Sequence, residues 1–467
     1  MKDSFVNFDG VIPTYFKVSL CYAGIKIRKT ARHTQEISPS VAELGNMIRK
    51  KDPLLRCIAV FILVLSLFSV AAVGAVSAQE EAGPTVIVGD SQRNAGTVYA
   101  LNASDGSERW KFETDDSIRA PAVVSEGTVY VGNDAAGRLY ALDATDGSEI
   151  WRHNTGGIIS SPSVSEGVVY LGSSDGNLYA LDVSDGSEVW TFGAESGIVS
   201  SAFVSDGSVY IGDTNGTVYA LDSSDGSERW SFKTNASVTS SPTVAGGTVY
   251  VGDNNGRLYA LDSEEGSEVW RYESENARAY GLSSPTVADG TVYIGGLGGV
   301  IKAVDVSDGS EEWTRSVSEQ VRSSPTVADG MLYVGTQDGN MYALNASDGS
   351  DMWRFETERG FLSSPTVVDD IVFIGSRWPD NEVHALDAKA GTELWSYAAE
   401  GVLYSPTVVG DTSGSSIGSR VAHGTRGNND DLRAGEMLVS SDLGSINIVR
   451  GGGGGDGDDA DVRPRRP

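Results

Sequence analysis

Eight copies of one phrase run through the chain, each close to YALDxxDGSExW and each ending in tryptophan. The tryptophans recur every 39 to 43 residues, at Trp110, Trp151, Trp190, Trp230, Trp270, Trp313, Trp353 and Trp395. Self-similarity at a fixed period near 40 means that one supersecondary unit is repeated along the chain, and a repeated unit decides the fold class before any local pattern does.

Each unit reads as four short strands joined by tight turns. The stretch 240–270 is SSPTVAGGTVYVGDNNGRLYALDSEEGSEVW, in which β-branched and aromatic runs are separated by AGG, DNNG and SEEG. Asn-Gly between such runs is a strong hairpin signal, because both central positions favour a positive φ. Four strands in sequence form an antiparallel meander, and eight meanders around an axis form a β-propeller. We therefore expect an all-β, eight-bladed propeller over residues 84–450.

The eight repeat tryptophans are expected to have a structural role. A large aromatic on the outer strand of a blade can pack against the neighbouring blade and bury a large apolar area. Each motif tryptophan is followed by Lys, Arg, Thr or Ser and never by Asp, which argues against the WD type of propeller.

The phrases ALDATDGSEIW (141–151) and HALDAKAGTELW (384–395) resemble the tryptophan-docking motif of pyrroloquinoline-quinone (PQQ) type repeats. That family includes eight-bladed quinoprotein alcohol dehydrogenases. It also includes a non-enzymatic branch, the lipoprotein subunit of the bacterial outer-membrane barrel-assembly machinery. The resemblance covers about 84–410 and implies either a PQQ-dependent dehydrogenase with Ca²⁺ or a propeller without cofactor.

The cysteines favour the branch without cofactor. The resemblance implies that the dehydrogenases place a vicinal disulfide against PQQ and hold Ca²⁺ in an inserted segment rich in Glu, Asn and Asp. Cys21 and Cys57 are the two cysteines of this chain, both precede residue 79, and no such insertion is present. We therefore expect no catalytic residues, no metal site and no bound cofactor, and keep the PQQ-dependent dehydrogenase as the alternative.

The order of the strands predicts how the ring closes. Eight SPTV-like segments alternate with the tryptophan strands, but the first tryptophan unit has none before it and the last segment, 405–409, has no tryptophan after it. We expect 405–409 to pair with the first blade and so remove an open sheet edge. Residues 436–449 resemble two strands of a decayed unit, which either covers the closing blade or forms an incomplete ninth.

The two ends of the chain differ in composition from the repeats. Residues 57–78 are apolar and uncharged, follow a basic run and end in small residues, as in a signal peptide or a single membrane anchor. We assign 47–78 to that segment and interpret 1–46 as a mis-assigned upstream extension. Residues 451–467, rich in Gly and Asp, are expected to be disordered. The propeller is then exported to the cell surface or the extracellular space.

Charge indicates the environment and excludes one class of partner. The formal net charge is −29, which would strain a compact protein by self-repulsion at low salt. Concentrated salt screens that repulsion. The composition resembles that of halophilic, in particular haloarchaeal, proteins. A chain this acidic lacks the basic surface that binding to nucleic acid requires.

Binding residues are sought where the repeat is broken. Arginine, tyrosine and tryptophan dominate binding hot spots. They stand at irregular positions before the inner strands and in two longer loops, giving as partner-binding candidates Arg119, Arg278, Tyr280, Arg322, Arg377, Trp378 and Tyr404. Under the closure above, Arg119 and Tyr404 lie on adjacent blades.

Four N-x-S/T sequons begin at Asn102, Asn215, Asn235 and Asn345 and could carry N-glycans. Drift of the repeat's own Asp explains Asn102 and Asn345 equally well.

The sequence as a whole predicts an exported, non-catalytic scaffold that binds a protein or an envelope component. A cell-surface carbohydrate-binding module is a further alternative.

Overall fold

The computed structural model describes residues 83–92, 95–134, 136–157, 160–273, 283–358, 360–361, 363–377 and 379–410, with the backbone of 436–440 and 446–450. All regular structure in these residues is β. They contain no helix long and apolar enough to cross a bilayer, and the signal or anchor segment predicted at 57–78 lies outside them.

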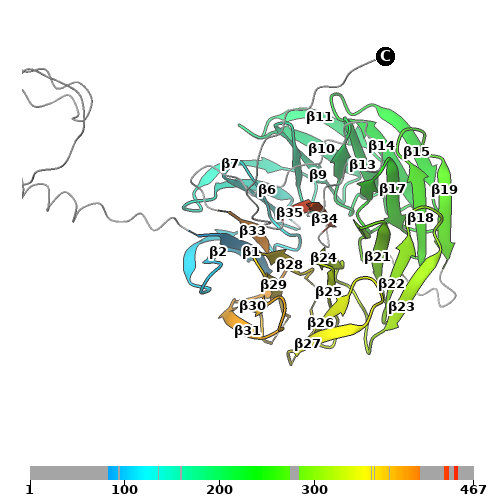
Figure 1. The fold of residues 1–467 in the computed structure, drawn as a ribbon. Coiled ribbons are helices and arrows are strands. Elements are labelled where there is room, and N and C mark those ends of the chain that lie inside the picture. Colours follow the sequence, from blue (N-terminus) through cyan, green and yellow to red (C-terminus); the bar gives the residue numbers. More distant parts are fainter. Residues whose placement is uncertain are drawn as a thin grey trace, which may run out of the picture. The chain divides into compact units, whose positions relative to one another are not determined.

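The strands form eight antiparallel sheets that follow one another around a ring, as Figure 1 shows. Each blade has an inner strand of three residues followed outward by a second, third and fourth strand. The expected all-β, eight-bladed propeller of four-stranded blades is therefore confirmed.

The inner strands are β33 (Thr407–Val409), β4 (Val123–Ser125), β8 (Ser163–Ser165), β12 (Phe203–Ser205), β16 (Thr243–Ala245), β20 (Thr286–Ala288), β24 (Thr326–Ala328) and β28 (Thr366–Val368). The second strands are β1 (Thr85–Ser91), β5 (Thr128–Gly132), β9 (Val168–Gly172), β13 (Ser208–Gly212), β17 (Thr248–Gly252), β21 (Thr291–Gly296), β25 (Met331–Gly335) and β29 (Ile371–Gly375). The blades are numbered 1 to 8 in this order.

The third strands are β2 (Gly96–Asn102), β6 (Arg138–Asp143), β10 (Asn177–Asp182), β14 (Thr217–Asp222), β18 (Arg257–Asp262), β22 (Val300–Asp305), β26 (Asn340–Asn345) and β30 (Glu382–Asp387). The outer strands are β3 (Glu108–Thr114), β7 (Glu149–Asn154), β11 (Glu188–Gly193), β15 (Glu228–Lys233), β19 (Glu268–Glu273), β23 (Glu311–Ser316), β27 (Asp351–Glu356) and β31 (Glu393–Ala398).

The ring closes as the sequence predicts. Strand β33 pairs antiparallel with β1, with Thr85 opposite Val409 and Ile87 opposite Thr407, so the last inner strand completes the first blade. The short strand β32 (Val402–Leu403) also pairs with β1. Strands β34 (Glu436–Ser440) and β35 (Ile446–Arg450) pair with each other as a separate two-stranded sheet, and this hairpin is not joined to the sheet of any blade.

Every repeat tryptophan docks on the following blade. Its indole Nε1 donates a hydrogen bond of 2.8–3.0 Å to a backbone carbonyl there. The acceptors, in ring order from Trp110, are Ala144, Val183, Ser223, Ser263, Val306, Ala346, Ala388 and, for Trp395, Ala103. The ring also lies over a turn glycine, so that a Cβ on Gly147 would come within 2.5 Å of Trp110. Glycine is therefore needed at this turn for two reasons: a side chain would collide with the indole, and the backbone has a φ of +73°.

Serine hydroxyls join the blades at the hub. A serine stands two residues before most inner strands, and its backbone N–H donates to the Oγ of the same serine in the next blade, in six successive bonds of 2.7–3.0 Å that run from Ser161 to Ser405. Threonine hydroxyls form further bonds between blades, such as Thr286 Oγ1 to the carbonyl of Pro325 at 2.6 Å. Blade 2 has Ala120 in the place of the serine and interrupts the chain of serine bonds.

Candidate functional site

The structure departs from its repeat where the chain enters blades 1 and 2. In the other six blades a buried serine clasps the end of a second strand, since its Oγ accepts a hydrogen bond of 2.8–3.1 Å from that strand's last or next-to-last glycine. The clasping serines are Ser160, Ser200, Ser240, Ser283, Ser323 and Ser363. Tyr404 and Arg119 stand where blades 1 and 2 lack this serine.

A one-residue deletion explains the difference. In blade 8 the buried Phe361 and Pro365 lie four positions apart in the chain, whereas Leu403 and Pro406 lie only three positions apart. Ile118 and Pro121 in blade 2 are also three apart. In blade 1 a backbone bond takes the place of the clasp, because the N–H of Tyr404 donates to Gly89 O at 3.2 Å. The N–H of Ile118 donates to Asp90 O at 3.3 Å, a bond that the other entry segments also make, as Val238 does to Asp213 O.

Three predicted residues come together at this place. Arg119 Nε lies 3.1 Å from Asp134 Oδ2, and the Arg119 side chain is 57% exposed. Burial raises the pKa of the Tyr404 phenol; the nearby charges of Arg119 and Arg377 oppose the rise, and that of Asp134 adds to it. We call these four residues the mouth cluster. They come from blades 8, 1 and 2, and all stand at the end of the ring that carries the hairpins between second and third strands.

The remaining candidates do not join the cluster. Arg322 precedes the inner strand of blade 7, and its Nε donates to Gln320 Oε1 at 3.3 Å. Arg278, Tyr280 and Trp378 lie outside the described residues. Asp134 was missed by the sequence analysis, because an aspartate in a turn is ordinary in this repeat.

Several buried carboxylates have a structural explanation and are not free for chemistry. Asp213 Oδ1 accepts a hydrogen bond from the N–H of Thr217 at 2.7 Å, and its Oδ2 accepts one from the Tyr219 hydroxyl at 3.3 Å. The side chain therefore stabilises the hairpin in which it lies. Asp90 does the same in blade 1 through Thr97 and Tyr99, and its burial raises its pKa. Among the described residues, no group of three His, Cys, Asp or Glu is placed to hold a metal ion.

The sequons divide into two pairs. Asn102 and Asn345 are half-buried, and each Oδ1 accepts from the N–H and the hydroxyl of the serine two residues on. Repeat aspartates such as Asp222 make the same two bonds, consistent with drift from Asp. Asn215 and Asn235 are exposed, and Asn215 Nδ2 donates to Glu195 Oε2 at 2.9 Å. Glycosylation of any of the four stays a prediction.

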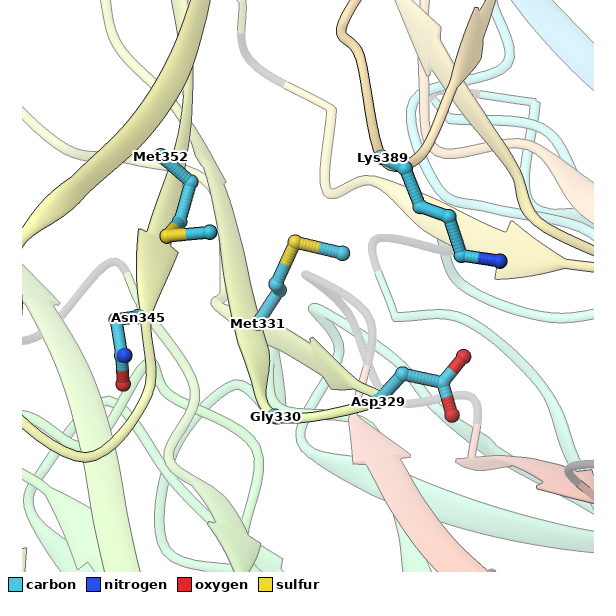
Figure 2. A pocket seen from close by; sticks show the side chains of 6 residues that line it. All are labelled: Asp329, Gly330, Met331, Asn345, Met352 and Lys389. Carbon is cyan, nitrogen blue, oxygen red and sulfur yellow. The ribbon is translucent and has the colours of Figure 1, made fainter.

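A hollow of about 350 Å³ opens between blades 7 and 8, beside the turn that joins β24 to β25 (Figure 2). Met331 and Met352 line it, and Lys389 at its edge pairs with Asp370 at 2.9 Å. The two thioethers are weak hydrogen-bond acceptors and the ammonium group is already paired, so this hollow offers few polar groups that could recognise a specific ligand. The mouth cluster remains the candidate site.

Comparison with known proteins gives a family and a fold. The family model described as outer membrane protein assembly factor BamB matches residues 94–197, 188–324 and 298–429. Comparison with curated proteins finds no match.

Among solved structures, BamB from Moraxella catarrhalis is similar with a TM-score of 0.54 and 21% identity, over 70% of this chain and 92% of that one. The computationally designed Ika8 protein gives 0.55 and 16%, over 71% and 96%. Quinohemoprotein alcohol dehydrogenase ADHIIG from Pseudomonas putida HK5 gives 0.56 and 16%, over 64% and 69%. At these identities the likeness shows the fold alone.

Proposed function

The chain belongs to the family described as outer membrane protein assembly factor BamB, and from that premise we propose that it is an exported, non-catalytic scaffold that binds a protein or another envelope component. The observation that carries the proposal is the mouth cluster. Arg119, Arg377 and Tyr404 have the residue types that dominate binding hot spots, and they converge where the repeat is broken.

The blade architecture supports a scaffold role. Eight docked tryptophans and the serine bonds of the hub fix the blades relative to one another, so the residues at the end of the ring are held on a rigid frame. A site on a rigid frame loses little conformational entropy when a partner binds. The family is described as an outer membrane protein assembly factor, and that description supports a partner-binding role in an envelope.

Export and a saline environment are parts of the same proposal. The apolar segment 57–78 after a basic run supports export, and the net charge of −29 supports a concentrated-salt medium. The measurement for export is N-terminal sequencing of the protein recovered from the medium or from washed cells.

The residues present do not fit PQQ with Ca²⁺. The described part of the chain offers no group of three His, Cys, Asp or Glu for the cation, and the cysteines of the sequence lie before residue 79. The similarity to a quinohemoprotein dehydrogenase is one of fold. We therefore derive no catalytic step for this protein.

The test is a pull-down from envelope extract in concentrated KCl with the tagged wild type and with the variant Arg119→Ala, Arg377→Ala, Tyr404→Phe. We expect the wild type to recover a partner that the triple variant loses. The matched control is Arg152→Ala with Arg271→Ala, which removes two arginines of the outer strands that are already paired with glutamates. Equal recovery by the wild type and both variants would remove the mouth cluster as the binding site.

A further inference from the structure

We propose that the mouth cluster recognises a single carboxylate group on a protein partner, either a chain terminus or the side chain of an Asp or Glu. This inference rests on the proposed function and gives the chemistry of the contact. It follows from the hydrogen-bond donors that the structure leaves unpaired, from the charge of the cluster and from the rigidity of its backbone.

The cluster contains donors without acceptors. Arg377 is half-buried as a residue, and its guanidinium has no hydrogen-bond or ion-pair partner among the described residues; the Tyr404 hydroxyl has none either. Arg119 uses only its Nε, on Asp134, which leaves its two terminal nitrogens free.

The other described arginines each bind an oxygen of the protein. They are Arg109, Arg138, Arg152, Arg229, Arg257, Arg271, Arg315, Arg322 and Arg354. Seven of these nine pair with an acidic side chain, and Arg109 and Arg322 bind neutral oxygens, so an arginine whose guanidinium binds no protein oxygen is exceptional among the described residues. Arg377 and Tyr404 keep unpaired donors in a half-buried place, which favours an acceptor supplied by a ligand, and the exposed Arg119 can reach the same ligand from solvent.

The charge of the cluster matches a monoanion. Two guanidinium groups and one carboxylate, that of Asp134, leave one positive charge in surplus. A carboxylate neutralises that surplus, and its two oxygens fit the fork of a guanidinium in a bidentate pair. A phosphate dianion would exceed the surplus beside Asp134, and a polyanion would be repelled by the acidic chain as a whole.

Tyr404 supplies a neutral donor. A phenol keeps its proton at neutral pH, and burial raises the pKa of Tyr404 further, so its hydroxyl can donate to an anionic oxygen. Tyrosine beside arginine is also typical of contacts between proteins, which favours a protein carboxylate over that of an acidic sugar.

The backbone holds these side chains in place before a ligand arrives. Leu403 is fully buried and pairs with Asp90, and the next residue is Tyr404. Ile118, also fully buried, forms a bridge with Asn133, and these two residues directly precede Arg119 and Asp134. Residues anchored in this way give a preorganised site.

The experiment is saturation-transfer NMR with three short peptides on the full chain in concentrated KCl. N-acetyl-Gly-Gly-Phe presents a terminal carboxylate, N-acetyl-Gly-Glu-Gly-amide a side-chain carboxylate, and N-acetyl-Gly-Gly-Phe-amide none. We expect the carboxylate peptides to bind and the amide to bind at least tenfold more weakly. Arg377→Gln and Arg119→Gln should each weaken the carboxylate peptides about tenfold, because each removes charge-assisted hydrogen bonds. Arg271→Gln should leave binding unchanged.

Several outcomes would overturn the inference: no peptide binds, the amide binds as well as the acids, or the arginine variants bind like wild type. Tighter binding of glucuronate or inorganic phosphate, added as competitors, would also overturn it in favour of a sugar or phosphate ligand. Thermal melts of each variant show whether it is folded, and Arg377→Lys keeps the charge if Arg377→Gln fails to fold. A partner recovered in the pull-down without carboxylate binding would refute this inference alone, and the reverse result would refute the proposed function.

Discussion

The indole Nε1 of Trp395 donates a hydrogen bond to the carbonyl oxygen of Ala103 at 2.9 Å, joining residues 292 positions apart in the chain. The equivalent bond is present at all of the other junctions between successive blades, but here it connects the last blade with the first. The bond from Tyr397 to Glu108 Oε2 at 2.6 Å spans the same junction, and the pairing of β33 with β1 inside blade 1 ties the strand that follows blade 8 to the start of the ring.

The junction between blades 8 and 1 should be as strong as an internal one. Trp395→Ala removes the indole and its hydrogen bond, and we expect a loss of about 3 kcal/mol in the free energy of unfolding, the scale for deleting a packed aromatic. Trp313→Ala, which removes the equivalent contact between blades 6 and 7, is the matched control with a similar expected loss. Urea titration measures both, and an unchanged midpoint for Trp395→Ala would contradict docking at this junction.

Two turn glycines separate backbone strain from steric contact. Gly147 has φ +73° and a Cβ there would lie 2.5 Å from Trp110, whereas Gly167 has φ +80° with no atom within 4 Å of the added Cβ. Gly167→Ala should therefore cost only the strain of a positive φ, about 1 kcal/mol. Gly147→Ala should cost clearly more, because the indole must move. Equal losses in urea titration would show that Trp110 does not pack on this turn.

Local sequence and topology together were enough to predict the architecture. The consensus unit of blade 5 divides into strands at Thr243, Thr248, Arg257 and Glu268, as the alternation of apolar runs and Gly turns predicts. The offset of the SPTV segments predicts the pairing of β33 with β1. The strands and the SPTV-like segments recur in each repeat, so a single sequence contains enough copies to recognise them.

The site could be predicted only in part. The closure placed Arg119 and Tyr404 on adjacent blades, but Arg377 enters from a loop of blade 8 and Asp134 from a hairpin of blade 2. Their meeting depends on a one-residue deletion in two entry segments and on how far each side chain reaches. Contacts made by a single substituted residue could not be predicted from the sequence either. Lys302 stands where the repeat usually has tyrosine, and it donates a hydrogen bond to Tyr272 of the preceding blade.

The serine bonds at the hub provide a third prediction with its own control. Ser241 Oγ accepts from the N–H of Ser201 at 3.0 Å, so Ser241→Ala leaves a buried donor unpaired and should cost about 1–3 kcal/mol. Ser161 is equally buried, but its Oγ has no hydrogen-bond partner among the described residues. Ser161→Ala should therefore be neutral or slightly stabilising. A comparison of the two variants by thermal unfolding would contradict this reading of the hub if Ser161→Ala were the more harmful.

Acid should weaken the contact between blades 5 and 6. Burial acts to raise the pKa of Glu311, but hydrogen bonds from Lys302, Thr314 and Tyr272 prevail and hold that pKa at about 2, below its usual 4.5. A carboxyl group whose pKa is lowered in the folded state stabilises that state at pH values above its unfolded pKa. This stabilisation is lost as the pH falls from about 4.5 towards 2.

Glu311→Gln should consequently lower the urea midpoint at neutral pH and reduce the dependence of that midpoint on pH below 4.5. The side chain is 39% exposed, so the loss should be modest and should shrink in concentrated salt. Glu268→Gln is the control, because Glu268 holds the same register in blade 5 but, among the described residues, has an ion pair with the nearby Arg271 alone, at 3.6 Å. If both variants followed the same pH curve, the bond from Lys302 to Glu311 would not contribute to the acid sensitivity of the ring.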